Sequence, residues 1–233
     1  MAALDLQLHC LPAAQRRLWT ELGSVPPEFV LCGGTALALM LGHRKSVDFD
    51  FFSYRAIDTR RLLSTIDFLC DAKVIQQDIN TLTVEVKRGA KVRVSFFGVP
   101  KLNRIKTTRL LSEPKIKLAS PIDLAGMKAA VITQRVEIKD YLDLHALFTQ
   151  TSLTFLDALA AAGKVYGPQF NPLLGIKALA DLNAPQLIKL PAAVKSTLET
   201  IAAEIELRHL AQSIKTRKLS GPCQLSPIKP RSR

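Results

Sequence analysis

The spacing of hydrophobic and polar residues divides the chain into two parts with different secondary structure. In the first part, short alternating stretches that predict β-strands are mixed with stretches of helical periodicity. We expect strands at residues 28–32, 46–52, 72–76, 81–87, 91–97 and 115–119, and helices at residues 13–22, 35–41 and 59–69. Residues 1–119 are therefore typical of an α/β domain.

After Ser120 and Pro121 the pattern becomes helical throughout. Serine suits the cap of a helix and proline suits its first position. We expect helices at residues 122–135, 139–149, 153–162, 173–180 and 192–210. These form a predicted helical domain over residues 120–213. Prolines and clustered basic residues predict a flexible tail over residues 214–233.

Two carboxylates stand one residue apart within an apolar stretch of the strand predicted at residues 46–52. Side chains alternate between the two faces of a strand, so Asp48 and Asp50 share one face, while Val47, Phe49 and Phe51 point into the core. Carboxylates this close repel each other unless a cation lies between them. Mg²⁺ suits the pair, because it commonly takes one or two carboxylates together with substrate phosphates.

A glycine pair upstream of these carboxylates adds the elements of a phosphate site. Backbone at Gly33 and Gly34 can approach a phosphate closely, and a helix that begins at Thr35 directs free N–H groups towards it. The hydroxyls of Thr35 and Ser46 can donate to phosphate oxygens, and Arg44 adds positive charge. A glycine pair alone is usually a turn, but the combination with Asp48 and Asp50 predicts a metal–nucleotide site.

The charge of the chain indicates a polyanionic partner. The 233 residues carry a net charge of +12, and such a balance favours nucleic acid. Basic residues cluster before residue 120 and again in the tail; the first cluster contains Lys87, Arg88, Lys91 and Arg93. A generic solubilising surface is the alternative explanation.

Other features of composition indicate a cytoplasmic protein without a membrane span. The longest apolar run, residues 29–41, is shorter than the about 20 residues that a membrane helix needs, and the N-terminus lacks the pattern of a signal peptide. The cysteines and histidines are scattered without a zinc pattern, so we expect reduced, buried thiols.

Residues 33–52, GGTALALMLGHRKSVDFDFF, closely resemble the signature of the AbiEii/AbiGii-like nucleotidyltransferase toxins, a branch of the polymerase-β-type nucleotidyltransferase superfamily. Residues 123–128 (DLAGMK), Arg135 and residues 139–144 (KDYLDL) are similar to later motifs of that family, and the resemblance runs from about Glu28 to Phe148. It implies an α+β fold, with a small mixed sheet and flanking helices followed by an all-helical C-terminal domain.

The resemblance also implies an activity and partners. A nucleoside monophosphate would pass from an NTP, with Mg²⁺, to an acceptor that in some family members is the 3′ end of tRNA, and an antitoxin protein would be the partner. A small-molecule acceptor, as in antibiotic adenylyltransferases, and a non-catalytic relative that binds NTP or nucleic acid are the alternatives.

By the same resemblance, Gly33, Gly34 and Ser46 would hold the triphosphate, and Asp48 and Asp50 the metal. Lys128 would reach the nucleotide phosphates, and Asp140 or Asp143, which share one helix face, would act near the acceptor as a base. Structural alternatives are a snorkelling Lys128, a solvated face for the two aspartates, and an Asp123 that only complements the helix dipole.

One position departs from the wider superfamily, which usually carries a third carboxylate on a later strand. Ser95 stands where that acid is expected. Glu85, on the preceding strand, is a candidate substitute. The third acid helps to orient the attacking oxygen in a two-metal mechanism, so its identity bears directly on the activity.

Overall fold

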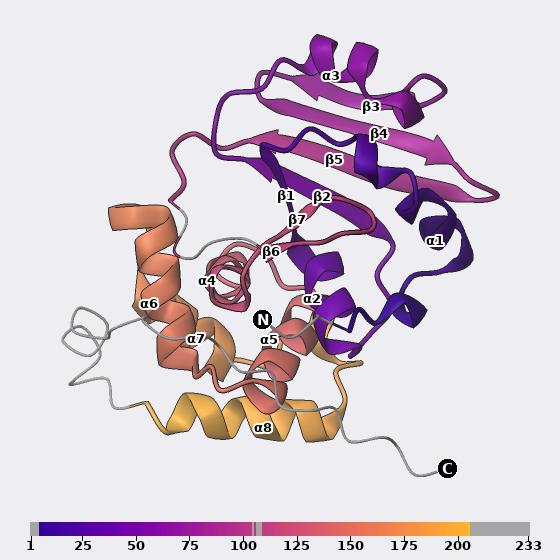
Figure 1. Cartoon of the computed structure of the whole chain (residues 1–233). Helices are drawn as coiled ribbons and strands as arrows, with labels where there is room; N and C mark the ends of the chain where they lie inside the picture. Colours follow the sequence, from indigo (N-terminus) through magenta and orange to yellow (C-terminus); the bar gives the residue numbers. More distant parts are fainter. Residues whose placement is uncertain (1–4, 104, 106–108, 206–233) are drawn as a thin grey trace. The chain divides into compact units, whose positions relative to one another are not determined.

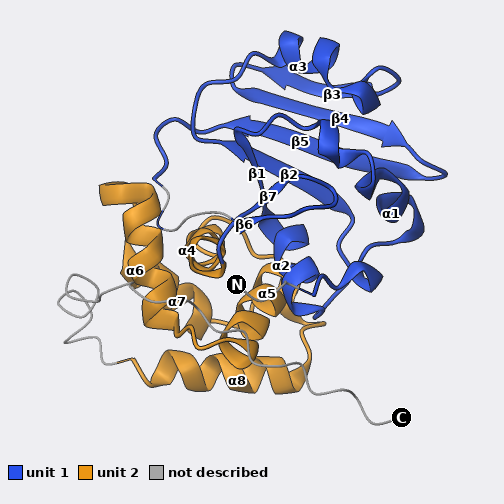
Figure 2. Cartoon of the chain, viewed as in Figure 1, with its two compact units in different colours: residues 1–120 blue, residues 121–233 orange. Residues whose placement is uncertain are grey.

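The computed structural model describes residues 5–103, 105 and 109–205, and these form two compact units, residues 1–120 and 121–233 (Figures 1 and 2). The predicted basic tail lies outside the described residues, as do residues 206–210 of the last predicted helix. Across the part of the chain that is described, no helix is both long enough and apolar enough to cross a membrane.

The first unit is built on a seven-stranded mixed sheet with the order β3-β4-β5-β2-β1-β7-β6 (Figure 1). Its strands are β1 (Phe29–Cys32), β2 (Asp48–Ser53), β3 (Lys73–Asp78), β4 (Thr81–Lys87), β5 (Lys91–Gly98), β6 (Arg109–Leu110) and β7 (Lys117–Leu118). The β2–β5 and β1–β7 pairs are parallel and the others are antiparallel. The predicted strands are confirmed; β6 was not predicted, because two residues are too short to show a period.

The first unit also contains helices and short helical turns. They are η1 (Leu8–Cys10), α1 (Ala13–Trp19), η2 (Leu22–Ser24), α2 (Gly33–Leu41), α3 (Thr59–Thr65) and η3 (Asp67–Leu69). Gly42 ends α2 in the left-handed conformation, with φ 67°, as its position predicts. The helix predicted over residues 59–69 is split into α3 and η3.

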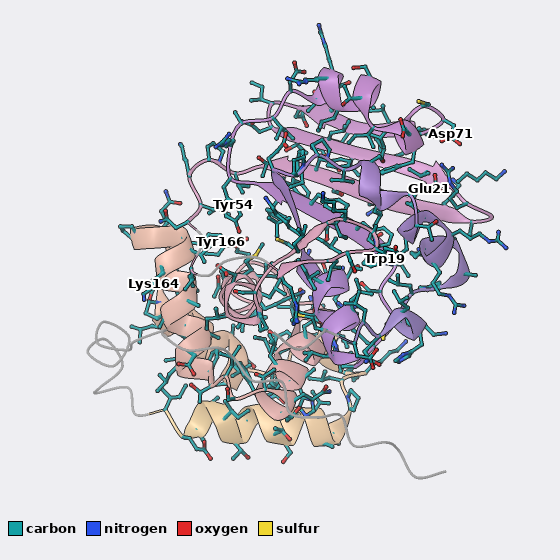
Figure 3. The ribbon with its side chains drawn as sticks, in the orientation of Figure 1. Trp19, Glu21, Tyr54, Asp71, Lys164 and Tyr166 are labelled. Carbon is teal, nitrogen blue, oxygen red and sulfur yellow. The ribbon has the colours of Figure 1, made fainter. Side chains whose placement is uncertain are left out.

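The core of the first unit lies on one face of β2 and β5. Phe49 and Phe51 are fully buried there, and Trp19 of α1 stacks on Phe49 with ring centroids 6.3 Å apart (Figure 3). The prediction that Val47 also faces the core is wrong, since its side chain is 51% exposed. Val47 precedes β2, and its carbonyl accepts a hydrogen bond from Gln15.

Arg88, at the turn between β4 and β5, does not belong to the open basic surface that the sequence indicates. Its guanidinium donates two hydrogen bonds to Glu21, at 2.6 and 2.7 Å, and a third to Asp71 at 3.1 Å (both acids are labelled in Figure 3). The hydrogen bonds to Glu21 raise the pKa of Arg88. Its charge is therefore balanced inside the unit, whereas Lys87, Lys91 and Arg93 are exposed.

The cysteines only partly follow the prediction of buried thiols. Cys10 and Cys32 are buried, and burial raises the pKa of the Cys10 thiol. Cys70, which directly follows η3, is exposed, and Cys223 lies outside the described residues.

The described residues of the second unit form helices, as predicted. They are α4 (Pro121–Val131), α5 (Ile138–Gln150), α6 (Phe155–Tyr166), η4 (Gly167–Gln169), α7 (Pro172–Ala180), η5 (Pro185–Leu187) and α8 (Ala192–Ala203). A Cβ at Gly126 of α4 would lie 2.8 Å from the backbone of Ala161 and Ala162 in α6. The glycine of the segment 123–128 is thus needed for close packing of two helices.

Candidate active site

The start of α2 lies against one of the two predicted metal ligands. Gly33 has φ +69°, a region that residues with a side chain rarely adopt. A Cβ at this position would lie 2.9 Å from Oδ2 of Asp50. The helix begins at Gly33, two residues earlier than predicted, so the N–H groups of Gly33, Gly34 and Thr35 belong to its first turn. Such N–H groups have no partner within the helix and suit an anion.

The two carboxylates lie on the same face of β2, as the alternation predicts. Asp48 and Asp50 are half-buried. Phe49 and Phe51, which alternate with them along the strand, are fully buried on the opposite face. On the neighbouring parallel strand β5, Arg93 is the register partner of Asp48, and Ser95 is that of Asp50. Residues in register point to the same side of the sheet, so this face combines two acids, a hydroxyl and an exposed guanidinium.

The hydroxyls of Thr35 and Ser46 are engaged within the protein. Thr35 donates to the backbone carbonyl of Asp48, and its hydroxyl lies 2.8 Å from that of Ser46. Both residues are buried, at 3% and 7% exposure. They therefore tie the first turn of α2 to the start of β2 and so position Asp48. Arg44 is half-buried and donates to the carbonyl of Lys45 at 3.0 Å.

The structure argues against Glu85 as the third acid. Glu85 pairs in register with Arg93, which in turn pairs with Asp48, so Glu85 lies two strands away. Two strand spacings amount to roughly 9–10 Å. Its carboxylate also forms an ion pair with Lys91 at 3.0 Å. Ser95 itself is buried and accepts a hydrogen bond from Thr83 at 3.4 Å, so a hydroxyl and not an acid lies beside Asp50.

The donor set of this face fits Mg²⁺. Among the described residues, no group of three or more His, Cys, Asp or Glu side chains could hold a metal ion. Asp48 and Asp50 would therefore share a cation with oxygen atoms from outside the protein. Mg²⁺ is commonly bound in this way, by one or two carboxylates, water and substrate phosphates.

The remaining predicted residues form a buried ionic cluster in the second unit. Lys128 of α4 lies 2.7 Å from Asp140 and 2.6 Å from Asp143 of α5, and Arg135 reaches Asp140 at 2.9 Å. Asp140 and Asp143 are 0% exposed and Lys128 is 6% exposed. The predicted common face of the two aspartates is confirmed. The alternatives of a solvated face and a snorkelling lysine are wrong, because all three side chains are buried. The ion pairs offset the cost of burying these charges.

Asp123 completes the set of predicted residues. It lies in the first turn of α4 and is 2% exposed. The glycines and Asp48 with Asp50 thus come together within the first unit, and the lysine with its aspartates within the second. Arg93 was not predicted as a neighbour of Asp48, since β2 and β5 are not consecutive and no local pattern indicates their pairing.

Gly33→Ala tests the close approach of Asp50. The added methyl group would force Asp50 Oδ2 away, and φ +69° adds backbone strain of about 1–2 kcal/mol. We expect binding of Mn²⁺, measured by electron paramagnetic resonance, to weaken about tenfold or more. Gly163→Ala is the control, because a Cβ there meets nothing within 4 Å. Equal Mn²⁺ affinity in both variants would contradict this geometry.

Comparisons with known proteins identify the family and the fold. The model of the family described as nucleotidyl transferase AbiEii toxin of a type IV toxin–antitoxin system matches residues 17–211. An uncharacterized protein of Aquifex aeolicus is 35% identical over 122 residues, which are 52% of this chain and 57% of that protein. The match therefore spans little more than half the length of that relative.

Solved structures show the same fold. JHP933 from Helicobacter pylori superposes with a TM-score of 0.53 at 17% identity. MenT4, a nucleotidyltransferase toxin from Mycobacterium tuberculosis, superposes with a TM-score of 0.53 at 15% identity. Each comparison covers 87% of this chain and 90% of the other. The predicted nucleotidyltransferase-type fold is confirmed.

Proposed function

Because this chain belongs to the AbiEii family of nucleotidyltransferase toxins, we propose that it transfers a nucleoside monophosphate from an NTP to an RNA acceptor, specifically tRNA, with Mg²⁺ bound by Asp48 and Asp50. The observation that carries the proposal is the pair of carboxylates on one face of β2, with Asp50 against Gly33 at the start of α2. This arrangement supports a metal site next to a helix start that suits phosphate.

Each candidate site residue of the first unit has a proposed part in binding the NTP. The backbone N–H groups of Gly33 and Gly34 bind the triphosphate, and Arg44 adds positive charge beside it. Thr35 and Ser46 hold Asp48 in place through the hydrogen bonds described above. Mg²⁺, when bound, would neutralise charge on the phosphates and make the α-phosphorus a better electrophile.

The cluster of Lys128, Asp140 and Asp143 has a proposed part in the transfer step. An acceptor hydroxyl oxygen forms a bond to the α-phosphorus, the bond to the bridging oxygen of pyrophosphate breaks, and pyrophosphate leaves. The hydroxyl proton passes to a base. We propose Asp140 or Asp143 for this role, which requires that carboxylate to leave its buried ion pair with Lys128. Lys128 pairs with both carboxylates, and its ammonium is the proposed contact to phosphate.

Exposed basic residues on the site face support a polyanionic acceptor. Arg93 lies beside Asp48 in register, and Lys91 and Lys87 follow on the same face towards the β4–β5 turn. The one acid among them, Glu85, is paired with Lys91. Positive charge therefore extends from the carboxylates along β5. A cationic small molecule would be repelled by this strip, whereas an RNA backbone would be attracted.

Transfer of label from each α-labelled NTP to total RNA tests the proposal. We expect label on a band of tRNA size for the wild type. Arg93→Glu with Lys91→Glu should reduce labelling about tenfold or more. It should also lower, by roughly 1–2, the slope of the logarithm of the RNA-binding constant against the logarithm of salt concentration. Arg60→Glu with Arg61→Glu, which reverses two exposed charges on α3, is the matched control. Label on small molecules alone would favour the antibiotic-type alternative.

The proposal extends to organisation and partners. Residues 1–119 would be the nucleotidyltransferase domain, residues 120–213 a helical domain, and residues 214–233 a basic tail that adds affinity for RNA. A cognate antitoxin would oppose the activity, as the type IV toxin–antitoxin assignment of the family implies. We place the activity in the cytoplasm, where NTP and tRNA occur together.

A further inference from the structure

Two phenylalanines lie side by side on neighbouring strands β2 and β5, on the face that carries Asp48 and Asp50. On the face that carries Asp48 and Asp50, the next residue of β2 is Phe52, and on β5 Phe97 follows Ser95. Phe52 and Phe97 are register partners, and their ring centroids lie 5.0 Å apart with the planes tilted by 39°. Both side chains are only half-buried.

These rings are more exposed than the aromatic pair on the opposite face of the sheet. The neighbouring pair Phe51 and Phe96, with centroids 5.5 Å apart, points to the opposite face and is fully buried. Phe29 packs on Phe96 there and is 2% exposed. The hydrophobic face of the sheet thus has its own aromatic cluster. The second aromatic pair lies on the face of the carboxylates, beside the buried Val30 of β1, the register partner of Phe52, and both rings keep exposed surface that a ligand can reach.

The position of the pair fits one part of a nucleotide. Phe52 lies two residues beyond Asp50, about 7 Å along the strand. In a nucleotide, the ribose alone separates the base from the α-phosphate, so phosphates at Gly33 and Asp50 leave the base within reach of Phe52 and Phe97. Thr81, the register partner of Phe97 on β4, is half-buried. Its hydroxyl can form a hydrogen bond with the edge of a base.

We propose that Phe52 and Phe97 form a stacking site for a nucleobase. The inference rests on the proposed nucleotide transfer and identifies the surface that holds a base during it. Every base has a π-face, and aromatic side chains stack on it with little dependence on sequence. The base belongs either to the incoming NTP or to the terminal nucleotide of the RNA, and the two sources give different results below.

Phe52→Leu and Phe97→Leu remove the aromatic faces while keeping apolar side chains. We expect binding of ATP, GTP, CTP or UTP with Mg²⁺, measured by titration calorimetry, to weaken roughly tenfold to hundredfold. Binding of inorganic tripolyphosphate, which has no base, should not change, and Phe52→Tyr should retain NTP affinity. If the base is that of the RNA, NTP affinity stays unchanged and the KM for RNA rises by the same factor.

A fluorescent variant keeps the proposal testable if a leucine variant fails to fold. The native Trp19 is buried in the core on the other face, so an indole introduced by Phe52→Trp reports on the site. We expect an NTP or a short RNA to quench its added emission and tripolyphosphate to leave it unchanged. Equal effects of all three ligands would overturn the stacking site.

Three results separate this inference from the proposed function. A wild type that transfers label, together with leucine variants whose NTP affinity and KM for RNA are both unchanged, overturns the stacking site alone. A loss of unfolding free energy in those variants, with both constants unchanged, would assign the pair a purely structural role and overturn it equally. A wild type that binds neither NTP nor tripolyphosphate overturns the proposed function itself.

Discussion

Asp48→Asn should abolish nucleotide transfer, by about a thousandfold or more, while the free energy of unfolding changes little. The carboxylate is half-buried on the polar face of β2, so its loss opens no cavity in the core. Metal coordination contributes several kcal/mol of transition-state stabilisation, and about 4 kcal/mol corresponds to a thousandfold in rate. Label transfer from NTP to RNA and unfolding by urea, measured on the same preparation, check both parts.

Glu85→Gln is the matched control for that experiment. Glu85 belongs to the same cross-strand row as Asp48, with Arg93 between them, and carries the same charge two strands away. We expect its transfer rate to stay within a few-fold of the wild type. A loss comparable to that of Asp48→Asn would restore Glu85 as the third acid. Full activity of Asp48→Asn would refute the metal site.

Local patterns were sufficient for those parts of the site that depend on a single strand or turn. The alternation around Phe49 correctly predicted that Asp48 and Asp50 share a face, and the position of Gly42 predicted the end of α2. The short apolar segment before Gly33 predicted β1. Each of these features follows from the period of a strand or the chemistry of a helix end, which a few neighbouring residues determine.

Features that depend on pairing between distant segments could not be predicted. The position of Arg93 beside Asp48 follows from the parallel pairing of β2 with β5, and two strands of sequence separate them. The same pairing shows that Glu85 is too far from Asp48. The hydrogen bond from Thr35 to the Asp48 carbonyl likewise requires the fold, so hydroxyls that were predicted to bind phosphate are found to position Asp48.

The motif on α4 and α5 of the second unit could also be predicted only in part. The spacing of Asp140 and Asp143 predicted their common face, but it did not predict that this face is buried against α4. Lys128 satisfies both carboxylates at once, and only a packed structure shows that a lone lysine in an apolar helix has two partners. The side chains proposed to take part in transfer are therefore the same ones that stabilise the second unit.

Lys128→Ala should destabilise the second unit by about 3–5 kcal/mol, because it leaves two fully buried carboxylates without the ammonium that pairs with them. Arg135 still reaches Asp140 at 2.9 Å, which moderates the loss. Urea unfolding followed by circular dichroism measures the loss. Lys177→Ala, which removes an exposed lysine from α7, is the control and should change stability by less than about 0.5 kcal/mol.

A second substitution separates stability from activity at Lys128. Combining Lys128→Met with Asp143→Asn removes one charge of each sign, so most of the lost stability should return. Transfer activity should stay low if Lys128 contacts phosphate, even where circular dichroism shows a folded protein. Recovery of both stability and transfer in this double variant would show that the lysine serves only to balance the buried aspartates, and its proposed contact to the nucleotide would then be wrong.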